Sequence, residues 1–531
     1  TTIIDGNEYQ TTNQLRRKPG VYSRIKKNGE LEVEFNLARG MNFTMQLDPD
    51  DQIFYISFAN RKYRLWTLLN WLGIPDTEIE KIWGSKLLEI NKAGALNTEM
   101  SEISSIFEKL FKQENNNPDD IRKGLKKYFN EYTLLDPDVT EITLGDRFEH
   151  VDGQALLAAS KKLLNINLKK DEPDERDSLI FKNIYSVDDS LIAYFDKQAP
   201  IIQKKLKRNL LHKDTVRDIV SSATFSDSIK KFFTVGDLSS TPPQTNPTTI
   251  VAENAKTTLM GTGGIQSRHS ITMEMRDIHP SHLGFLDSLN TPESFKVGIN
   301  VGLASEVRKI KKDLEVPVVD KNNKIHWLNP TQFYKYKIGF PDQYDIYDGK
   351  VKPNFDQVTV MYKGETIKIP HKEVDYYLRS PRTMFSLTTN LVPFLMNVQG
   401  NRGATSSRML TQALPLDEKE PPLVRTYRDS QSTYEDLIGG FLNPTSPVDG
   451  TISKIDKNYI YIKEDKTNRT HKIGLYNDFP LNQDGYLNST VLVKEGQKIK
   501  KGDILTENNY STGKVLSLGK NLRVAYLSYK G

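Results

Sequence analysis

MGTGGIQSRHSITMEMRDIHPSHLGFLDSLNTPESFKVGINVGLA occupies residues 260–304 and is the most informative stretch of the chain. Glycines stand at positions 261, 263 and 264, and glycine permits positive φ angles and close backbone approach. We therefore predict a loop at the start of this segment. Arg268, His269 and Arg276 follow and supply donors for anionic oxygens. The pattern alone leaves two interpretations open, a phosphate-facing loop and an ordinary glycine-rich turn.

Composition indicates a folded, multidomain protein. The chain has 531 residues, which predicts roughly three to four domains. Charged residues make up 27% and aromatic residues 9%, values that argue against global disorder. The formal net charge is only +5, so any contact with nucleic acid must come from local placement of basic residues.

Three function classes are disfavoured by what the sequence lacks. It contains no cysteine, which excludes disulfides and thiolate zinc sites on these residues. No apolar run approaches the ~20 residues of a membrane helix. The polar opening TTIIDGNEYQ is not a signal peptide. We expect no membrane association and a cytoplasmic location.

Hydrophobic periodicity changes along the chain. Residues 31–57 alternate apolar and polar positions and predict a β meander. Residues 64–83 change to helical spacing, with a second helix starting at Pro75 and Asp76, and helices dominate to about position 236. We predict a polar, proline-broken loop over 237–249 and a β-rich segment over roughly 310–380.

Two groups of residues could suggest metal binding. Asp48, Asp50 and Asp51 in LDPDD cluster carboxylates as a two-metal site would, but their setting favours a turn. His279 and His282 have HxxH spacing, yet no cysteine or carboxylate pair lies nearby. We predict hydrogen-bonded or packed histidines, and no metal held by this chain.

RDIHPSHLG (276–284) followed by NTPESFKVGINVGLA (290–304) resembles the fork region of the β subunit of multisubunit DNA-dependent RNA polymerases. The family pattern usually has an acidic residue where Asn290 stands and a glycine where Ser294 stands, which puts details of the loop in doubt. Further blocks resemble the same family in the same order, at residues 1–22, 47–74, 389–416, 493–505 and 517–531.

The resemblance implies an α+β, multidomain fold with barrel-sandwich elements. It divides the chain into a first protrusion segment (1–30), the lobe (31–200), a second protrusion segment (201–237), the fork region (238–309), the external domain (310–385) and the beginning of the hybrid-binding domain (386–531).

The resemblance also implies a function. The chain is expected to be the N-terminal portion of a split β-like subunit, as in polymerases of giant bacteriophages. It would position template DNA, the RNA–DNA hybrid and the incoming NTP, and would be inactive alone. Expected partners are a separate chain with the C-terminal half of β, β′-like chains, DNA, the RNA transcript and, as an open alternative, a promoter-specificity factor. Mg²⁺ would be held by the β′-like subunit. The cytoplasm would then be that of an infected bacterial host.

Site residues follow from matching positions. Arg402 matches the family arginine expected to bind the NTP triphosphate, and a planar guanidinium suits that task. Lys256, Arg268, Arg408 and Gln412 are the expected nucleic-acid contacts. Two further residues, Arg276 and Glu293, are expected to brace the fork.

Residues 238–261 align with the wall where rifamycin-type inhibitors bind bacterial polymerases. Pro243, Glu253 and Lys256 replace the usual aspartate, histidine and arginine there, which predicts rifamycin resistance. Two alternatives stay open. VDGTISKI (448–455) with VKEGQKIKKGDIL (493–505) also fits a barrel-sandwich carrier scaffold. The chain could also be a non-enzymatic nucleic-acid-binding protein.

Overall fold

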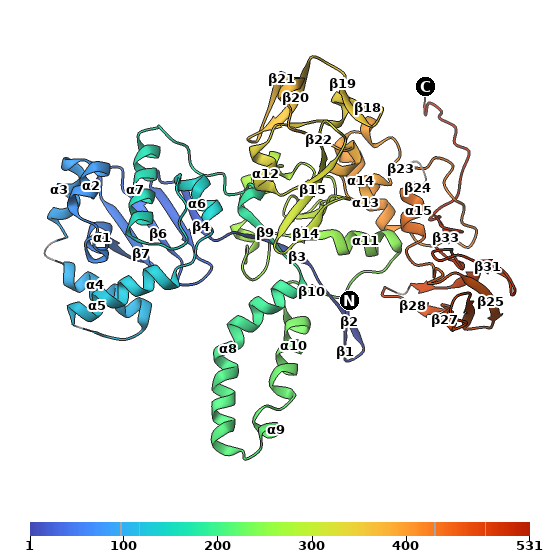
Figure 1. Ribbon diagram of the computed structural model, residues 1–531, viewed down its shortest axis with the longest axis horizontal. Helices are drawn as coiled ribbons and strands as arrows, with labels where there is room; N and C mark the ends of the chain where they lie inside the picture. Colours follow the sequence, from blue (N-terminus) through green and yellow to red (C-terminus); the bar gives the residue numbers. More distant parts are fainter. Residues whose placement is uncertain (96–97, 116, 430–431, 484, 531) are drawn as a thin grey trace. The chain divides into compact units, whose positions relative to one another are not determined.

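The computed structural model describes residues 1–95, 98–115, 117–429, 432–483 and 485–530, and it has the predicted α+β, multidomain architecture (Figure 1). The chain forms two compact units. One unit is Arg17–Asn183, and the other combines Thr1–Arg16 with the chain from Ile184 onward. The first unit overlaps the predicted lobe (31–200) but begins earlier and ends earlier. The named subdomains remain predictions.

The Arg17–Asn183 unit is built on an antiparallel meander of five strands whose spatial order follows the sequence. The strands are β4 (Gly20–Ile25), β5 (Leu31–Asn36), β6 (Phe43–Leu47), β7 (Phe54–Phe58) and β8 (Arg61–Arg64). The predicted meander over 31–57 is therefore confirmed. Phe35 and Phe43 pair across neighbouring strands, and their rings stack 4.4 Å apart within the main apolar core.

Helices cover this sheet, and α7 packs on β5 and β6 (Figure 1). The helices are α1 (Leu65–Leu72), α2 (Asp76–Trp83), α3 (Ser85–Ala93), α4 (Glu99–Phe111), α5 (Pro118–Lys127), a π-helix (Tyr128–Tyr132), α6 (Pro137–Leu144) and α7 (Gly153–Asn167). The predicted start of a helix at Pro75 and Asp76 is confirmed. Asp48 lies in a turn, where its carboxylate accepts the amides of Asp50 and Asp51 at 3.0 and 3.4 Å, so the turn interpretation of LDPDD is also confirmed.

The second unit contains a long helical hairpin and a central sheet. The hairpin pairs α8 (Val187–His212) with α10 (Ala223–Val235), and α9 (Val216–Ile219) lies at its tip (Figure 1). In the sheet, β11 (Lys256–Thr258) lies between β13 (Asn300–Leu303), its antiparallel neighbour, and β3 (Asn13–Arg17), its parallel neighbour. The short strand β12 (Leu286–Asp287) pairs with the other edge of β13. A separate three-stranded sheet consists of β1 (Thr2–Ile4), β2 (Asn7–Thr11) and β10 (Ser239–Ser240), with β2 in the middle; this sheet is called the β2–β10 ribbon below.

The predicted loop over 237–249 is wrong for some of these residues. The segment 237–249 is not a loop throughout, because β10 forms within it and α11 (Pro247–Ala255) begins at its end. Asn246 caps α11 by accepting the amides of Thr248 and Thr249, and the fixed φ of Pro247 suits the first helical position. The proline that suggested a break therefore starts a helix.

The remaining sheets follow in sequence order. The β-rich prediction for 310–380 is confirmed by a seven-stranded sheet: β14 (Arg308–Ile310), β15 (Asp313–Val319), β16 (Ile325–Leu328), β17 (Ile338–Gly339), β20 (Gln357–Tyr362), β21 (Glu365–Pro370) and β22 (Tyr376–Leu378). Next come α13 (Leu387–Asn390), α14 (Gly400–Gln412) and α15 (Tyr434–Gly439). A four-stranded sheet then joins β25 (Gly450–Ile455), β26 (Tyr459–Glu464), β27 (Thr470–Gly474) and β31 (Lys498–Ile499).

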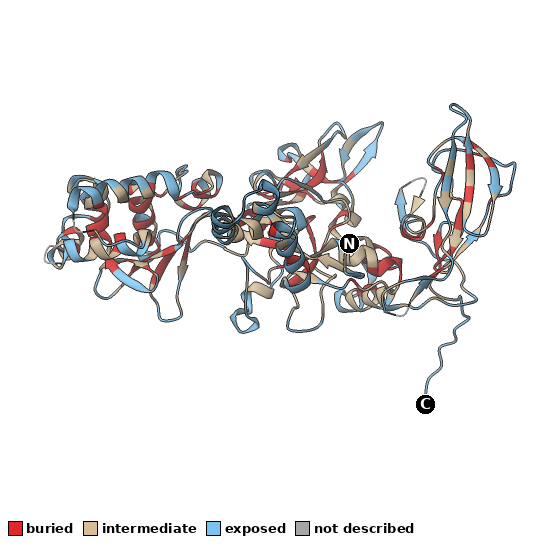
Figure 2. Cartoon of the chain, turned by 90° about the horizontal axis from the view of Figure 1, so that it is seen from below, coloured by how far each residue is buried: buried red, intermediate tan, exposed pale blue. Residues whose placement is uncertain are grey.

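Burial follows these elements. Figure 2 shows buried residues along the sheets and the inner faces of helices, whereas the segment leading to the C-terminus is exposed. Across the described ranges, no helix is both long and apolar enough to cross a membrane.

Candidate nucleotide and nucleic-acid interface

The segment 260–304 is held at both ends by one sheet. β11 directly precedes it, and β12 and β13 are its own strands, so its irregular portion lies between fixed ends. Thr258 anchors the start of the segment by donating its hydroxyl to the Asn300 side chain at 2.7 Å. The loop therefore starts and ends on a rigid support.

The predicted glycine loop is confirmed at its first two glycines. Gly261 and Gly263 have φ angles of 101° and 91°. A Cβ atom on Gly261 would lie 2.7 Å from the Leu238 side chain, and one on Gly263 would lie 2.9 Å from Nε of Arg16. Gly264 has no positive φ, but its Cβ would lie 2.3 Å from the carbonyl oxygen of Leu259. These glycines are needed for close packing within the protein.

The backbone also packs closely near the C-terminal end of the 260–304 segment. Gly298 has a φ of 70°, and its Cβ would lie 2.2 Å from the carbonyl oxygen of Arg276. Arg276 is half-buried, and its Nε atom has no hydrogen-bond partner among the described residues. Arg276 and Glu293 line the same cavity, with a volume of about 620 Å³. Their joint bracing role stays a prediction.

Helix α14 presents two faces. Gly403 and Ser407 are buried, and a Cβ on Gly403 would lie 3.4 Å from the Leu289 side chain, so the helix packs closely on the 260–304 segment. On the opposite side, Arg402 and Met409 are exposed and lie seven residues apart, which puts them on one helical face. The Arg402 side chain makes no ion pair or hydrogen bond with any residue that the structure describes. Its five donors are therefore available to a ligand.

Arg408 is held by the protein itself. Its guanidinium lies 3.1 Å from the Glu293 carboxylate and donates to the carbonyl of Thr291 at 2.8 Å. This pairing ties α14 to the 260–304 segment across more than a hundred positions of sequence. The ionic partner of Glu293 that the structure gives is thus Arg408. The predicted contact of Arg408 with nucleic acid would require sharing or exchanging these partners.

Lys256 and Glu253 also form an ion pair, at 3.0 Å. Both line a cavity of about 350 Å³ together with Arg408. Two of the three positions predicted to alter inhibitor binding therefore share one cavity. Pro243 is not among the described residues that line it.

The other predicted contacts lie on the surface. Arg268 is exposed, with its guanidinium 5.8 Å from the centre of the Phe295 ring. Gln412 is exposed at the last residue of α14. Asn290, where the family pattern differs, donates to the hydroxyls of Ser386 and Thr388 at 3.2 and 3.3 Å. That departure therefore has a structural role in anchoring the loop.

The histidine prediction is confirmed for His279. Its Nδ1 atom lies 2.7 Å from the Ser281 hydroxyl and accepts the Ser281 amide at 3.1 Å. The rings of His279 and His282 lie 5.9 Å apart. Within the described ranges, no group of three or more His, Cys, Asp or Glu residues is arranged to hold a metal ion.

Sequence reasoning missed Asn246, which is fully buried. Its side-chain amide donates to the carbonyls of Leu410 and Ala413 at 2.9 and 2.8 Å, at the end of α14. The sequence analysis placed this residue in a predicted loop, and nothing in the sequence indicated its contact with α14. This residue sets the position of the helix that carries Arg402.

Sequence comparisons relate this chain to known proteins. Residues 241–308 match the family model described as RNA polymerase Rpb2, domain 3. The chain is 27% identical over 574 residues to the DNA-directed RNA polymerase subunit beta of Prochlorococcus marinus (strain MIT 9301), covering 100% of this chain and 51% of that protein. It is 28% identical over 579 residues to the corresponding subunit of Synechococcus elongatus, covering 100% and 50%. The chain spans about half the length of these relatives and is similar to β subunits of DNA-directed RNA polymerases along its whole sequence.

Proposed function

We propose that this chain is a β-like component of a DNA-dependent RNA polymerase that positions the incoming NTP, the template and the RNA–DNA hybrid. The observation that carries the proposal is the exposed guanidinium of Arg402, which has no partner among the described residues and stands on a helix fixed against the 260–304 segment. A guanidinium that binds no carboxylate can grip two phosphate oxygens at once. Similarity along the whole chain favours this role over a carrier scaffold or a simple nucleic-acid-binding protein.

The proposal assigns the chemistry of nucleotidyl transfer to a partner. Two-metal catalysis needs clustered carboxylates that hold Mg²⁺, and the family motif expected to supply them belongs to a β′-like chain. This chain would contribute polar groups that orient phosphates: the cations Arg402 for the NTP and Arg268, Lys256 and Arg408 for nucleic acid, together with the neutral amide of Gln412. Of these, Arg402 and Arg268 are exposed, whereas Lys256 and Arg408 are engaged in ion pairs.

We further propose that the segment near the C-terminus pairs with additional β-like sequence on a separate chain. Leu522, Val524 and Tyr526 alternate with the smaller or polar residues Arg523 and Ala525 and are 76%, 69% and 96% exposed. Alternating apolar side chains on an extended segment suit strand addition to a partner sheet. The origin in a giant bacteriophage belongs to the same proposal.

Co-expression tests the proposal directly. The chain would be produced with candidate chains carrying the remaining β-like sequence and the β′-like sequence, purified through a tag on this chain, and assayed by primer extension with Mg²⁺. We expect a stable complex that extends primers, and no extension by this chain alone. Failure to co-purify with any such chain would contradict the subunit assignment.

Rifamycin resistance remains a proposal with its own support. The Lys256 ammonium lies 3.0 Å from the Glu253 carboxylate and neutralises it, and this pair lines the cavity of about 350 Å³. We expect primer extension by the reconstituted enzyme to continue at drug concentrations that stop a bacterial polymerase. Inhibition at equal concentrations would contradict it.

A further inference from the structure

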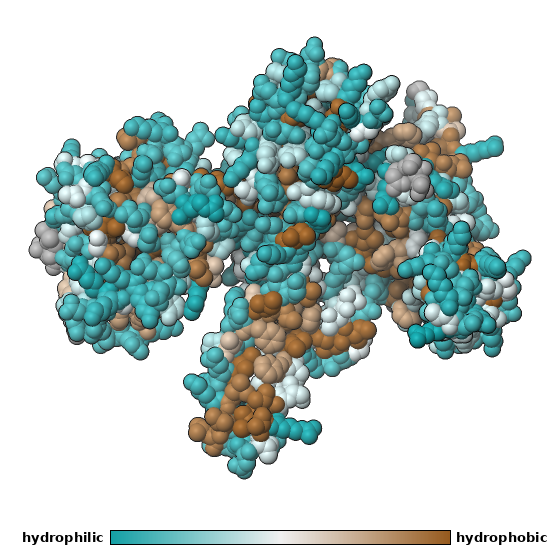
Figure 3. All heavy atoms as spheres, in the orientation of Figure 1, coloured by the Kyte–Doolittle hydropathy of each residue, from teal (hydrophilic) through white to brown (hydrophobic). Residues whose placement is uncertain are grey.

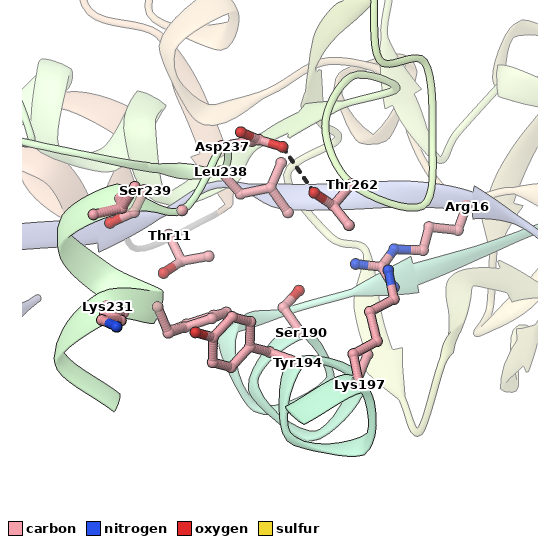
Figure 4. Close-up of a pocket in the computed structure, with 14 residues that line it drawn as sticks. Thr11, Arg16, Ser190, Tyr194, Lys197, Lys231, Asp237, Leu238, Ser239 and Thr262 are labelled. Atoms are coloured by element: carbon pink, nitrogen blue, oxygen red, sulfur yellow. Dashed lines mark hydrogen bonds between the residues drawn. The ribbon is translucent and has the colours of Figure 1, made fainter. Parts of the chain in front are cut away.

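A third cavity contains none of the residues proposed to contact the nucleotide or nucleic acid. It is bounded by the base of the α8–α10 hairpin, the β2–β10 ribbon and the start of the 260–304 segment, all within one unit (Figure 4). Its volume is about 420 Å³, within the usual range for small-molecule sites. Apolar side chains form most of its walls: Ala193, Tyr194, Phe232, Val235 and Leu238.

Three hydroxyl groups on the cavity wall are buried without partners. The side-chain oxygens of Thr11, Ser190 and Ser239 have no hydrogen-bond partner in the portion of the chain that the structure describes. Ser190 is only 3% exposed, and Figure 4 shows its hydroxyl directed into the cavity. A buried hydroxyl without a partner is unfavourable, so three around one cavity favour a ligand with hydrogen-bonding groups.

The charges around the cavity favour an anion. Arg16, Lys197 and Lys231 line it. Among the described lining residues the one carboxylate is that of Asp237, which accepts a hydrogen bond from the Thr262 hydroxyl at 2.7 Å. Figure 4 shows Arg16 and Lys197 at the end of the cavity opposite Lys231. Lys197 has no ion-pair partner among the described residues.

The guanidinium of Arg16 is fixed in place by its neighbours. Its Nε donates to the Gln14 side chain at 2.5 Å, and the group lies 4.2 Å from the centre of the Tyr185 ring. Desolvation by burial lowers the pKa of Arg16 below its ordinary value, so a bound anion would stabilise its charged form.

We propose that this cavity is a binding site for a small aromatic anion. The rings of Tyr194 and Phe232 lie 5.5 Å apart in a tilted arrangement and would pack against the aromatic body. The acidic head would lie by Arg16 and Lys197, and the Ser190 hydroxyl would donate to it. This site stands independently of the proposed function, because it shares no residue with the polymerase contacts.

Fluorescence titration of the purified chain tests the site. The probe is anilinonaphthalene sulfonate, and the comparison is uncharged phenylnaphthylamine, which has the same rings without the sulfonate. We expect saturable binding of the sulfonate and binding of the uncharged compound that is weaker by about tenfold or more, the loss of one charge-assisted contact. Equal affinity for the two compounds, or no binding of the sulfonate, would overturn the proposal.

Variants locate the bound probe. Ala193→Trp fills the cavity and Lys197→Glu reverses an exposed charge at its edge, so both should weaken sulfonate binding by about tenfold. The matched control for charge is Lys204→Glu, an exposed lysine of α8 outside the cavity lining.

The hairpin also has an exposed apolar surface, visible in Figure 3, to which the probe could bind instead. The control for such binding is Leu211→Ser, at a residue of this hairpin that is 79% exposed. Both controls should leave the affinity unchanged. Loss of binding in Leu211→Ser with full binding in Lys197→Glu would place the probe on that surface and overturn the proposal. Because Lys197 is exposed, its variant remains informative even if Ala193→Trp does not fold.

Discussion

The apolar core of the Arg17–Asn183 unit and the polar joint around Asn246 are stabilised in different ways. In the core, the rings of Phe35, Phe43 and Phe58 pack with centroid separations of 4.4 and 4.9 Å, and all three are at most 3% exposed. Apolar packing has no fixed direction, so such a core tolerates substitutions that keep its volume.

The polar joint comprises Asn246, Thr248 and Thr249, packed against the last residues of α14. Asn246 connects two helices through both ends of its amide, as an acceptor for α11 amides and a donor to α14 carbonyls. Hydrogen bonds depend on both distance and angle. The joint therefore fixes the orientation of α14, and with it Arg402, more strictly than apolar packing would.

Asn246→Leu should have the largest effect on stability. The two side chains are similar in size, but leucine leaves buried amides and carbonyls without partners, each at about 1–3 kcal/mol. We expect the free energy of unfolding to fall by more than about 3 kcal/mol, measured by urea denaturation.

The matched control is Met45→Leu, at a fully buried position of the apolar core. That exchange should lower the free energy of unfolding by less than about 1.5 kcal/mol. Equal losses in the two variants would contradict the distinction between the regions.

Lys182→Met tests a buried charge in the Arg17–Asn183 unit. Burial lowers the pKa of Lys182 to about 8, with Asp177 at 3.7 Å opposing the shift. Below pH 8 the Lys182 ammonium stays charged in the folded protein, where burial makes the charge less stable than in the unfolded chain. The lowering of its pKa from 10.5 to about 8 corresponds to a cost of up to about 3 kcal/mol in the free energy of unfolding. Stability should therefore rise with pH between 8 and 10.5, since the unfolded state binds more protons there.

The variant should be more stable at pH 7 and should lose this pH-dependent rise, as measured by urea denaturation at several pH values. Lys161→Met, at an exposed lysine of the same unit, should keep it. A wild-type rise that persists in Lys182→Met would assign the effect to another group.

Glu293→Gln should have the smallest effect. The Glu293 side chain is 65% exposed and lies 3.1 Å from the Arg408 guanidinium. Exposed ion pairs contribute about 0–1 kcal/mol to the free energy of unfolding. We expect a thermal midpoint close to that of the wild type and no dependence of the difference on salt above roughly 0.15 M. A fall in the free energy of unfolding as large as that expected for Asn246→Leu would show that this ion pair, rather than the polar joint, fixes the position of α14.

Sequence patterns predicted the elements whose signals are local. Alternation over 31–57 predicted the meander, and Pro75 with Asp76 predicted the start of α2. The same local reasoning failed at Pro247, where proline starts a helix inside a stretch predicted as loop. Whether a proline breaks or starts a helix depends on the residue before it, and here Asn246 caps the helix that begins at Pro247.

Contacts between distant positions could not be predicted. Asn246 reaches carbonyls 164 to 167 positions away, and Arg408 donates to a carbonyl 117 positions away. Family resemblance identified Arg402 and Arg408 as cations of the site, but only the structure shows that one is exposed and the other paired. The unpaired hydroxyls around Ser190 have no sequence signal, because they come from three separate elements.

The most direct test of the account is the nucleotide dependence of primer extension by the reconstituted enzyme with Arg402→Ala. Loss of a charge-assisted contact to the triphosphate should raise the apparent KM for NTPs by roughly tenfold to a hundredfold. Arg402→Lys should fall between, since it keeps the charge but loses the bidentate grip. Arg217→Ala, at an exposed arginine of α9, should behave as wild type. An unchanged KM in an Arg402→Ala enzyme that assembles normally would contradict the assignment of this chain as the component that positions the nucleotide.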